Sequence, residues 1–301
     1  MIIDMHGHPT MKFYMGKPVT ELGVDPKSKY VPPKDQAEAT SRMMKDISRM
    51  VKDMDKASID KRVLLTFGKD LDPKFNYAES DLSTGVTTPS SNEWVHTCME
   101  KYPDRFLGFA CIDPSKEGAI EELEQTISEY NFKGVKLFPC HHYYEANDKK
   151  IYPFYEKCVE LGICVSYHMG YTGSPIDRLR LQSPLTLDDV ARDFPKLNII
   201  ICHIAGHWFQ EATLVALGNP NVYVDLAWIH GYCNQLVIPT EPSFLIKRVV
   251  GILRDSKVLY GTDNDEKINN IFWMKGIGLK EESLRKIMGE NAARLLNIPL
   301  E

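Results

Sequence analysis

Short apolar runs alternate with longer amphipathic segments along the whole chain. The runs at 163–168 and 198–203 are largely apolar and rich in Val and Ile, which is typical of parallel strands buried on both faces. The segments between the runs carry apolar residues at helical spacing, most clearly at 43–54, 120–130 and 284–295. We predict eight strands, at residues 2–3, 62–67, 105–112, 134–138, 163–168, 198–203, 221–226 and 257–261.

Eight strands separated by helices predict an α/β fold, a single (β/α)8 barrel that occupies residues 1–301 as one domain. A doubly wound open sheet is the alternative, but no Gly-x-Gly-x-x-Gly follows the first predicted strand. Unusually long connections follow strands one and two, at 9–36 and 68–91, and connections of that length are usually functional. The first is either an aromatic lid over the barrel mouth or a packed surface loop. The residues after Asp263 form a helical tail.

The overall composition excludes several classes of protein. Hydrophobic residues make up 43% of the 301 residues, so the chain can bury a core. Its net charge of −5 lacks the basic footprint of a nucleic-acid binder. No apolar run approaches the roughly 18 residues that a membrane span needs, and no secretory signal is visible. Seven scattered cysteines without Cys-x-x-Cys spacing predict free thiols in the cytoplasm.

Metal-binding side chains stand at the ends of four predicted strands. His6 and His8 alternate along the first strand, so they point to the same side. The fifth, sixth and eighth strands end on His168, His203 and Asp263. Because all strand carboxyl ends in a barrel face one mouth, we expect these five side chains to converge. Imidazole and carboxylate ligands suit a divalent metal, zinc best, with manganese, iron or cobalt as alternatives.

Further motifs connect the chain with a known family. They are the Asp-x-His-x-His opening at 4–8, the segment 92–114 with its Tyr-Pro-Asp-Arg-Phe turn, Lys-Gly-Val-Lys-Leu at 133–137, Phe-Pro at 194–195 and Gly-Glu-Asn-Ala at 289–292. With these motifs the whole chain resembles the amidohydrolase superfamily. It is most similar to the amidohydrolase-related branch that includes aminocarboxymuconate-semialdehyde decarboxylase and the resorcylate-type decarboxylases.

This resemblance implies a role for each of the strand-end residues. His203 would orient or polarise the water or substrate, or bind a second metal. Asp263 would also accept a proton from metal-activated water. One divalent metal would be held by four side chains: His6, His8, His168 and Asp263.

Several neighbouring residues are weaker candidates. Lys136 would bridge two metals if carbamylated, as in binuclear members of the superfamily; otherwise it is a free ammonium that faces a substrate carboxylate or packs along the strand end. Asp4 would orient a metal ligand from behind. Each of the remaining candidates lines the substrate pocket or is merely a packed or solvated side chain: Arg178, Arg180, His141, His142, His207 and Trp228.

The sequence therefore predicts a metal-dependent hydrolase that acts on a small, carboxylate-bearing amide, lactone or similar molecule through metal-activated water. The alternative is a metal-dependent decarboxylase of an aromatic or muconate-type acid. A hydratase and a non-catalytic metal-binding barrel are further alternatives. The expected partner is a small-molecule substrate; relatives are commonly dimers, which leaves a homodimer open.

Overall fold

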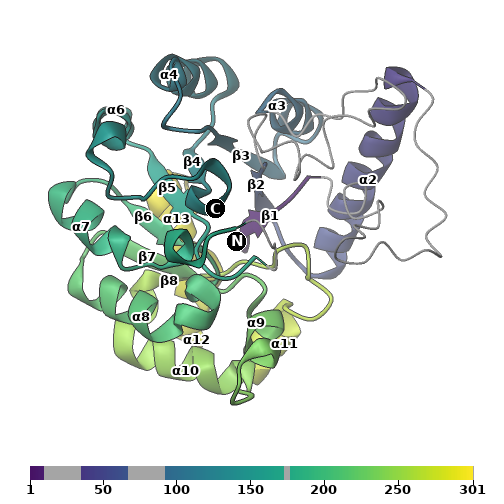
Figure 1. Ribbon diagram of the computed structural model, residues 1–301. Coiled ribbons are helices and arrows are strands. Elements are labelled where there is room, and N and C mark those ends of the chain that lie inside the picture. Colours follow the sequence, from purple (N-terminus) through teal and green to yellow (C-terminus); the bar gives the residue numbers. More distant parts are fainter. Residues whose placement is uncertain (10–34, 67–91, 173–176, 301) are drawn as a thin grey trace, which may run out of the picture.

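Eight parallel strands form one sheet in which each strand pairs with the next along the chain. The computed structural model describes residues 1–9, 35–66, 92–172 and 177–300 (Figure 1). Two backbone hydrogen bonds, Met5 N to Tyr260 O (2.9 Å) and Asp263 N to His6 O (2.8 Å), join the end of the last strand to the first. The strands are β1 (Ile3–Gly7), β2 (Lys61–Leu65), β3 (Phe106–Cys111), β4 (Gly134–Leu137), β5 (Cys164–Tyr167), β6 (Ile199–Ile201), β7 (Val222–Asp225) and β8 (Val258–Leu259).

Helices surround the sheet on its outer side and alternate with the strands, which confirms the (β/α)8 barrel (Figure 1). The α-helices are α2 (Gln36–Lys56), α3 (Asn92–Lys101), α4 (Ala119–Tyr130), α5 (Pro139–His142), α6 (Tyr152–Glu160), α7 (Thr186–Asp193), α8 (Phe209–Gly218), α9 (Ile229–Gln235), α10 (Pro242–Leu253), α11 (Ile271–Gly276), α12 (Glu281–Arg285) and α13 (Asn291–Leu296). The 3-10 helices are η1 (Lys149–Ile151), η2 (Leu179–Gln182), η3 (Cys202–Trp208) and η4 (Asp255–Lys257), and η5 (Lys286–Glu290) is a π-helix.

The helical tail after Asp263 is present as predicted, from α11 to α13. Most of the two long connections, 10–34 and 67–91, lies outside the described residues, and so does the suggested lid. The assignment of all 301 residues to one domain stays a prediction.

The barrel interior is filled by side chains from opposite strands. Ile3, Val63, Phe109, Ile200 and Leu259 belong to one buried cluster, and residues of strands this far apart meet only inside a barrel. The same cluster includes Ala292, Ala293, Leu295 and Leu296 of α13. The helix α13 therefore closes one end of the barrel, which leaves the other end for a site.

The strands are shorter at their carboxyl ends than the apolar runs predict. His168 and His203 lie just beyond β5 and β6, and Asp263 lies four residues beyond β8. The backbone of His203 and Asp263 is left-handed, with φ of +59° and +56°. Pairing has already ended at Ile201 and Leu259, and a left-handed residue could not continue a β-ladder. The polar residues predicted inside strand ends thus stand on the turns that follow them.

All seven cysteines are buried and unpaired, as the sequence predicts. In the described ranges, no helix has both the length and the apolar character that crossing a bilayer requires.

Candidate metal centre

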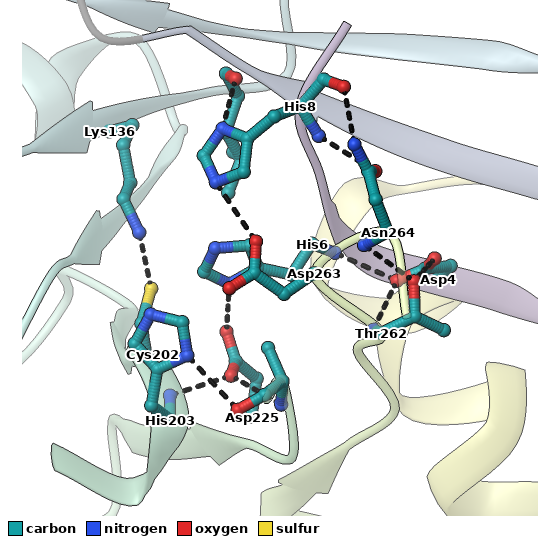
Figure 2. A network of polar contacts seen from close by, with 12 residues as sticks. Asp4, His6, His8, Lys136, Cys202, His203, Asp225, Thr262, Asp263 and Asn264 are labelled. Atoms are coloured by element: carbon teal, nitrogen blue, oxygen red, sulfur yellow. Dashed lines mark hydrogen bonds and ion pairs between the residues drawn. The ribbon is translucent and has the colours of Figure 1, made fainter. Parts of the chain in front are cut away.

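The five predicted strand-end side chains come together at the open end of the barrel. Ligand atoms of His6, His203 and Asp263 lie within 4.8 Å of one another. The ring centroid of His6 is 5.3 Å from that of His8 and 4.6 Å from that of His203. The His168 ring lies 5.1 Å from the His203 ring. Figure 2 shows four of these residues close together, with Lys136 and Cys202 beside them.

Two of the histidines have a fixed proton position. The Nδ1 atom of His8 lies 2.8 Å from the carbonyl oxygen of Leu65, and that of His203 lies 3.0 Å from the carbonyl oxygen of Ala227. A carbonyl oxygen only accepts hydrogen bonds, so each Nδ1 must carry the proton and donate it. In the neutral ring, Nε2 then keeps its lone pair. Both imidazoles are therefore in the tautomer that a metal ligand needs.

His6 is fixed in the same way by a carboxylate. Its Nδ1 lies 2.9 Å from Oδ2 of Asp225, which ends β7 and is buried. The other oxygen of Asp225 accepts from the backbone N–H groups of His203 (2.7 Å) and Ala227 (3.0 Å). Burial alone would raise the pKa of Asp225, but the His6 ring, His203 and a nearby lysine outweigh it and hold the pKa well below its usual range. A charged Asp225 therefore holds one ligand ring and the turn that carries His203.

Sequence reasoning did not single out Asp225. The sequence feature that could have identified it is a single carboxylate at the end of the apolar run Val222–Asp225. The histidines after β5 and β6 were identified from the same kind of feature. Asp4, which was expected to orient a ligand, does contact His6, but at its backbone N–H (3.0 Å). The imidazole ring of His6 is instead oriented by Asp225.

Asp4 lies at an irregularity in β1 and is bound by a charged network. The pairing of β1 with β2 shifts register between Asp4 and Gly7, so strict alternation does not hold along this stretch. Asp4 accepts hydrogen bonds from the backbone N–H and hydroxyl of Thr262 (2.9 and 2.6 Å) and from Arg62 Nε (2.8 Å). Arg62 is fully buried and also contacts Glu266 at 3.1 Å. This charged network fixes the ends of β1 and β8 against each other, directly behind the histidines.

Asp263 faces the histidines as a carboxylate. Its Oδ1 lies 3.2 Å from Nε2 of His8. Burial would raise the pKa of Asp263, but His8, His6 and His203 outweigh it and hold the pKa well below its usual range. Because Nδ1 of His8 is bound to Leu65, Nε2 is the ring nitrogen that faces the Asp263 carboxylate, and a cation between them would be bound by both.

The remaining imidazoles are held neutral. Burial lowers the pKa of His203 to about 4 and, together with the neighbouring charges, lowers the pKa of His168 well below its ordinary value. The Nε2 atom of His168 is buried and has no hydrogen-bond partner among the described residues. A buried polar atom without a partner is rare and needs an explanation. Metal coordination supplies one, since ligands must be unprotonated.

Lys136 lies at the inner side of the centre and is fully buried. Its Nζ donates to the sulfur of Cys202 at 2.7 Å, and Ser166 Oγ lies 3.0 Å from the same sulfur. Burial raises the pKa of the Cys202 thiol to about 12, even though Lys136 opposes the shift. The thiol is therefore neutral. Carbamylation of Lys136 stays a prediction.

The weaker candidates fall into two groups. His141 and His142 are buried in α5, and His141 stacks on Phe138 with ring centroids 5.0 Å apart. The His207 and Trp228 rings flank Tyr232, at 5.6 and 5.0 Å, and Tyr232 in turn lies 5.5 Å from His203. These aromatic residues stand beside the centre, so a role in substrate binding stays a prediction for them.

The two arginines lie farther out. Arg178 and Arg180 are both exposed, and Arg180 pairs with Glu145 on the surface. A surface ion pair of this kind is weak, so Arg180 can exchange Glu145 for another anion. Among the described residues, no contact links Arg180 to the histidines of the centre. The role of the two arginines in holding a substrate stays a prediction.

A family model and several known proteins match this chain. A family model described as amidohydrolase matches residues 3–298. A 2-keto-4-carboxy-3-hexenedioate hydratase from Sphingobium sp. (strain NBRC 103272 / SYK-6) is 25% identical over 204 residues, which cover 57% of this chain and 56% of that protein. A 2-amino-3-carboxymuconate-6-semialdehyde decarboxylase from Dictyostelium discoideum is 22% identical over 202 residues, which cover 57% of this chain and 54% of that protein. The matches thus span little more than half the length of these curated relatives.

Among solved structures, a dihydroxybenzoic acid decarboxylase from Polaromonas sp. JS666 superimposes with a TM-score of 0.64 at 17% identity, covering 98% of this chain and 96% of that chain. It was solved with bound manganese and the inhibitor 2-nitroresorcinol. At this level of identity the likeness establishes the fold alone.

Proposed function

The chain belongs to the amidohydrolase family, and from that premise we propose that it is a metal-dependent enzyme which activates water against a small, carboxylate-bearing substrate. Hydrolysis of an amide, lactone or similar bond is the first reaction that we propose. Its active site is the space between the five strand-end residues.

The donor set fits one divalent metal. We assign the ligands to His6, His8, His168 and Asp263, with His203 beside them. The main observation behind this assignment is the position of the ring protons. Nδ1 of His6, His8 and His203 donates to an acceptor outside the centre, so in the neutral rings the Nε2 lone pairs are available to bind a metal. Three nitrogen ligands and one oxygen ligand suit zinc best, and the manganese in the Polaromonas structure makes manganese the main alternative. When bound, the cation supplies a Lewis acid that lowers the pKa of water and polarises a substrate oxygen.

The protein's own groups favour the removal of a proton from water. Asp263 is held ionised, and neutral His203 presents an unprotonated Nε2. Their lowered pKa values make both weak bases, so proton removal requires water whose own pKa a bound cation would lower. Hydrolysis and hydration begin with the removal of a proton from water, whereas decarboxylation ends with the delivery of a proton to carbon. Two unprotonated groups beside the centre thus support water activation.

Positive charge at the centre favours the binding of an acidic substrate. Lys136 is buried beneath the centre, and a bound divalent cation would add to its field. The two curated relatives are named for reactions on carboxy-substituted acids. We propose the same class of substrate, a carboxylate-bearing acid, for the present chain. We do not assign it the substrate of either relative. We also place the protein in the cytoplasm, because seven buried free thiols fit a reducing compartment.

Decarboxylation is the second candidate, and the names of the Dictyostelium and Polaromonas proteins favour it. Hydration of a double bond is the third, and the name of the Sphingobium relative favours it. All three reactions can share the same ligands, so product analysis must separate them.

The test is a substrate panel assayed with the metal-stripped protein before and after addition of zinc or manganese. Amides, lactones, unsaturated acids and hydroxybenzoates are followed by pH change, by loss of absorbance from the conjugated double bond and by carbon dioxide release. Metal-dependent hydrolysis that is lost in Asp263→Asn supports the first proposal. Carbon dioxide release overturns it in favour of the decarboxylase, and failure of every class favours a non-catalytic barrel. Gel filtration of the same samples tests the homodimer.

The metal ligands are tested separately by measuring metal content. We expect His6→Ala and Asp263→Asn to retain far less metal than the wild-type protein after the same dialysis. Full metal content in both variants would refute the ligand assignment.

A further inference from the structure

A second group of ligand-type side chains lies outside the centre described above. Cys140, His141 and Asp177 place a sulfur, an imidazole nitrogen and a carboxylate oxygen within 4.8 Å of one another. Cys140 and His141 belong to α5, directly after β4, whereas Asp177 precedes η2 in the segment after β5. The group therefore joins two loops at the mouth of the barrel.

These side chains are removed from water. Cys140 is fully buried, and the side chains of His141 and Asp177 are 9% and 0% exposed. A buried carboxylate is costly unless charge or hydrogen bonds compensate for it. Within the described ranges, Asp177 forms no ion pair with a lysine or arginine; it contacts His141 and accepts a hydrogen bond from the Cys140 thiol. Its Oδ2 accepts from the Thr172 hydroxyl.

The spacing fits a small tetrahedral site. Nε2 of His141 lies 3.4 Å from Oδ2 of Asp177. Zinc bonds nitrogen and oxygen at about 2.0–2.1 Å, so two such ligands in a tetrahedron stand roughly 3.3 Å apart. The His141 ring is also held in place, because it stacks nearly parallel on Phe138, with 9° between the ring planes. Two ligands are thus already close to their coordinating separation.

We propose that Cys140, His141 and Asp177 bind a second divalent cation, with zinc as the preferred ion. A thiolate, an imidazole and a carboxylate form a set that zinc accepts and that magnesium or calcium does not favour. The fourth position would be left to water or to a ligand. This site does not depend on the proposed reaction, and it is distinct from a binuclear centre bridged by Lys136, because it uses none of the same ligands.

Zinc stoichiometry tests the proposal. The full chain, stripped with a chelator, is titrated with zinc, and we expect two equivalents for the wild-type protein and one for Cys140→Ser. The variant His6→Ala should keep the equivalent bound by the second site. Cys202→Ser removes the other buried thiol that lies close to candidate metal ligands, and it should still bind two equivalents.

Cobalt gives an independent signal, because a cobalt–thiolate bond produces a strong near-ultraviolet charge-transfer band. The band should persist in His6→Ala and Cys202→Ser and disappear in Cys140→Ser. Asp177→Asn, which leaves the sulfur in place, should weaken zinc binding at this site at least tenfold, and it provides a second test if Cys140→Ser does not fold.

Three results would overturn the proposal: a single zinc equivalent in the wild-type protein, two equivalents retained in Cys140→Ser, or a cobalt band that depends on Cys202. The group would then be a hydrogen-bonded cluster of thiol, carboxylate and imidazole. Because His6→Ala removes only the main centre, failure of the second site and failure of the proposed enzyme can be told apart.

Discussion

Replacing Asp225 by asparagine should separate the charge of this residue from its shape. An asparagine side chain can keep its oxygen at the position that accepts from the backbone N–H groups of His203 and Ala227. Its amide NH2 then occupies the position of Oδ2, facing Nδ1 of His6. Since NH2 only donates, the substitution favours the tautomer of His6 that carries its proton on Nε2.

The magnitude follows from this contact. The Nδ1 to Oδ2 hydrogen bond is 2.9 Å long and buried, and hydrogen bonds to charged groups contribute about 1.5–3 kcal/mol. To bind metal, the variant must break the new hydrogen bond and move the proton. Loss of such an outer partner typically lowers metal affinity by about 10–100-fold, or roughly 1.4–2.7 kcal/mol. We predict a loss of metal affinity within that range for Asp225→Asn.

The assay is competition for zinc against a chromophoric chelator at neutral pH. Asp193→Asn is the matched control, because it makes the same chemical change on an exposed surface carboxylate and should leave the affinity unchanged. Thermal unfolding of both metal-free variants checks that the fold is intact. An affinity of Asp225→Asn within twofold of the wild-type value would refute the tautomer argument.

Two further predictions concern stability. Arg62→Met should destabilise the protein by about 3–5 kcal/mol in urea unfolding, because it leaves Asp4 as a buried charge without its partner, whereas the exposed control Arg192→Met should cost less than about 1 kcal/mol. Equal effects of the two changes would contradict a structural role for the buried network. The metal-free protein should also lose stability as the pH falls below about 6.5, because His168 and His203 have lowered pKa values in the folded state and take up protons more readily when unfolded. At pH 5.5 each contributes a loss of up to about 1.4 kcal/mol, so urea midpoints that are equal at pH 7.5 and 5.5 would argue against neutral buried imidazoles.

The sequence predicted the barrel and the convergence of its strand-end residues because both depend on local patterns. Apolar runs locate the strands, and the closed parallel topology then brings His6, His168 and Asp263 to one end, whatever the details of packing. The contacts of Asp4 were not predictable in this way, since its side chain accepts hydrogen bonds from Arg62 and Thr262, which are distant in sequence. No pattern in a single chain reveals that pairing.

Contacts between distant turns were also beyond the reach of sequence. The approach of Asp177 to Cys140 depends on the path of the chain after β5, where spacing carries no information. Asp225 could have been found, since it closes an apolar strand just as the histidines do. A search for metal ligands misses Asp225 because this residue contacts the ring of a proposed ligand and nearby backbone N–H groups rather than the metal itself.

The position of α13 affects how the chain folds during its synthesis. Its Ala292 and Leu296 cover the same interior cluster as Ile3 and Val63, which are synthesised long before them. At roughly 5–20 residues per second, the first strand waits about 15–60 s on the ribosome before its cover emerges. During that interval the nascent barrel exposes an apolar floor, so we expect chains released before α13 to be bound by chaperones or degraded rather than to fold.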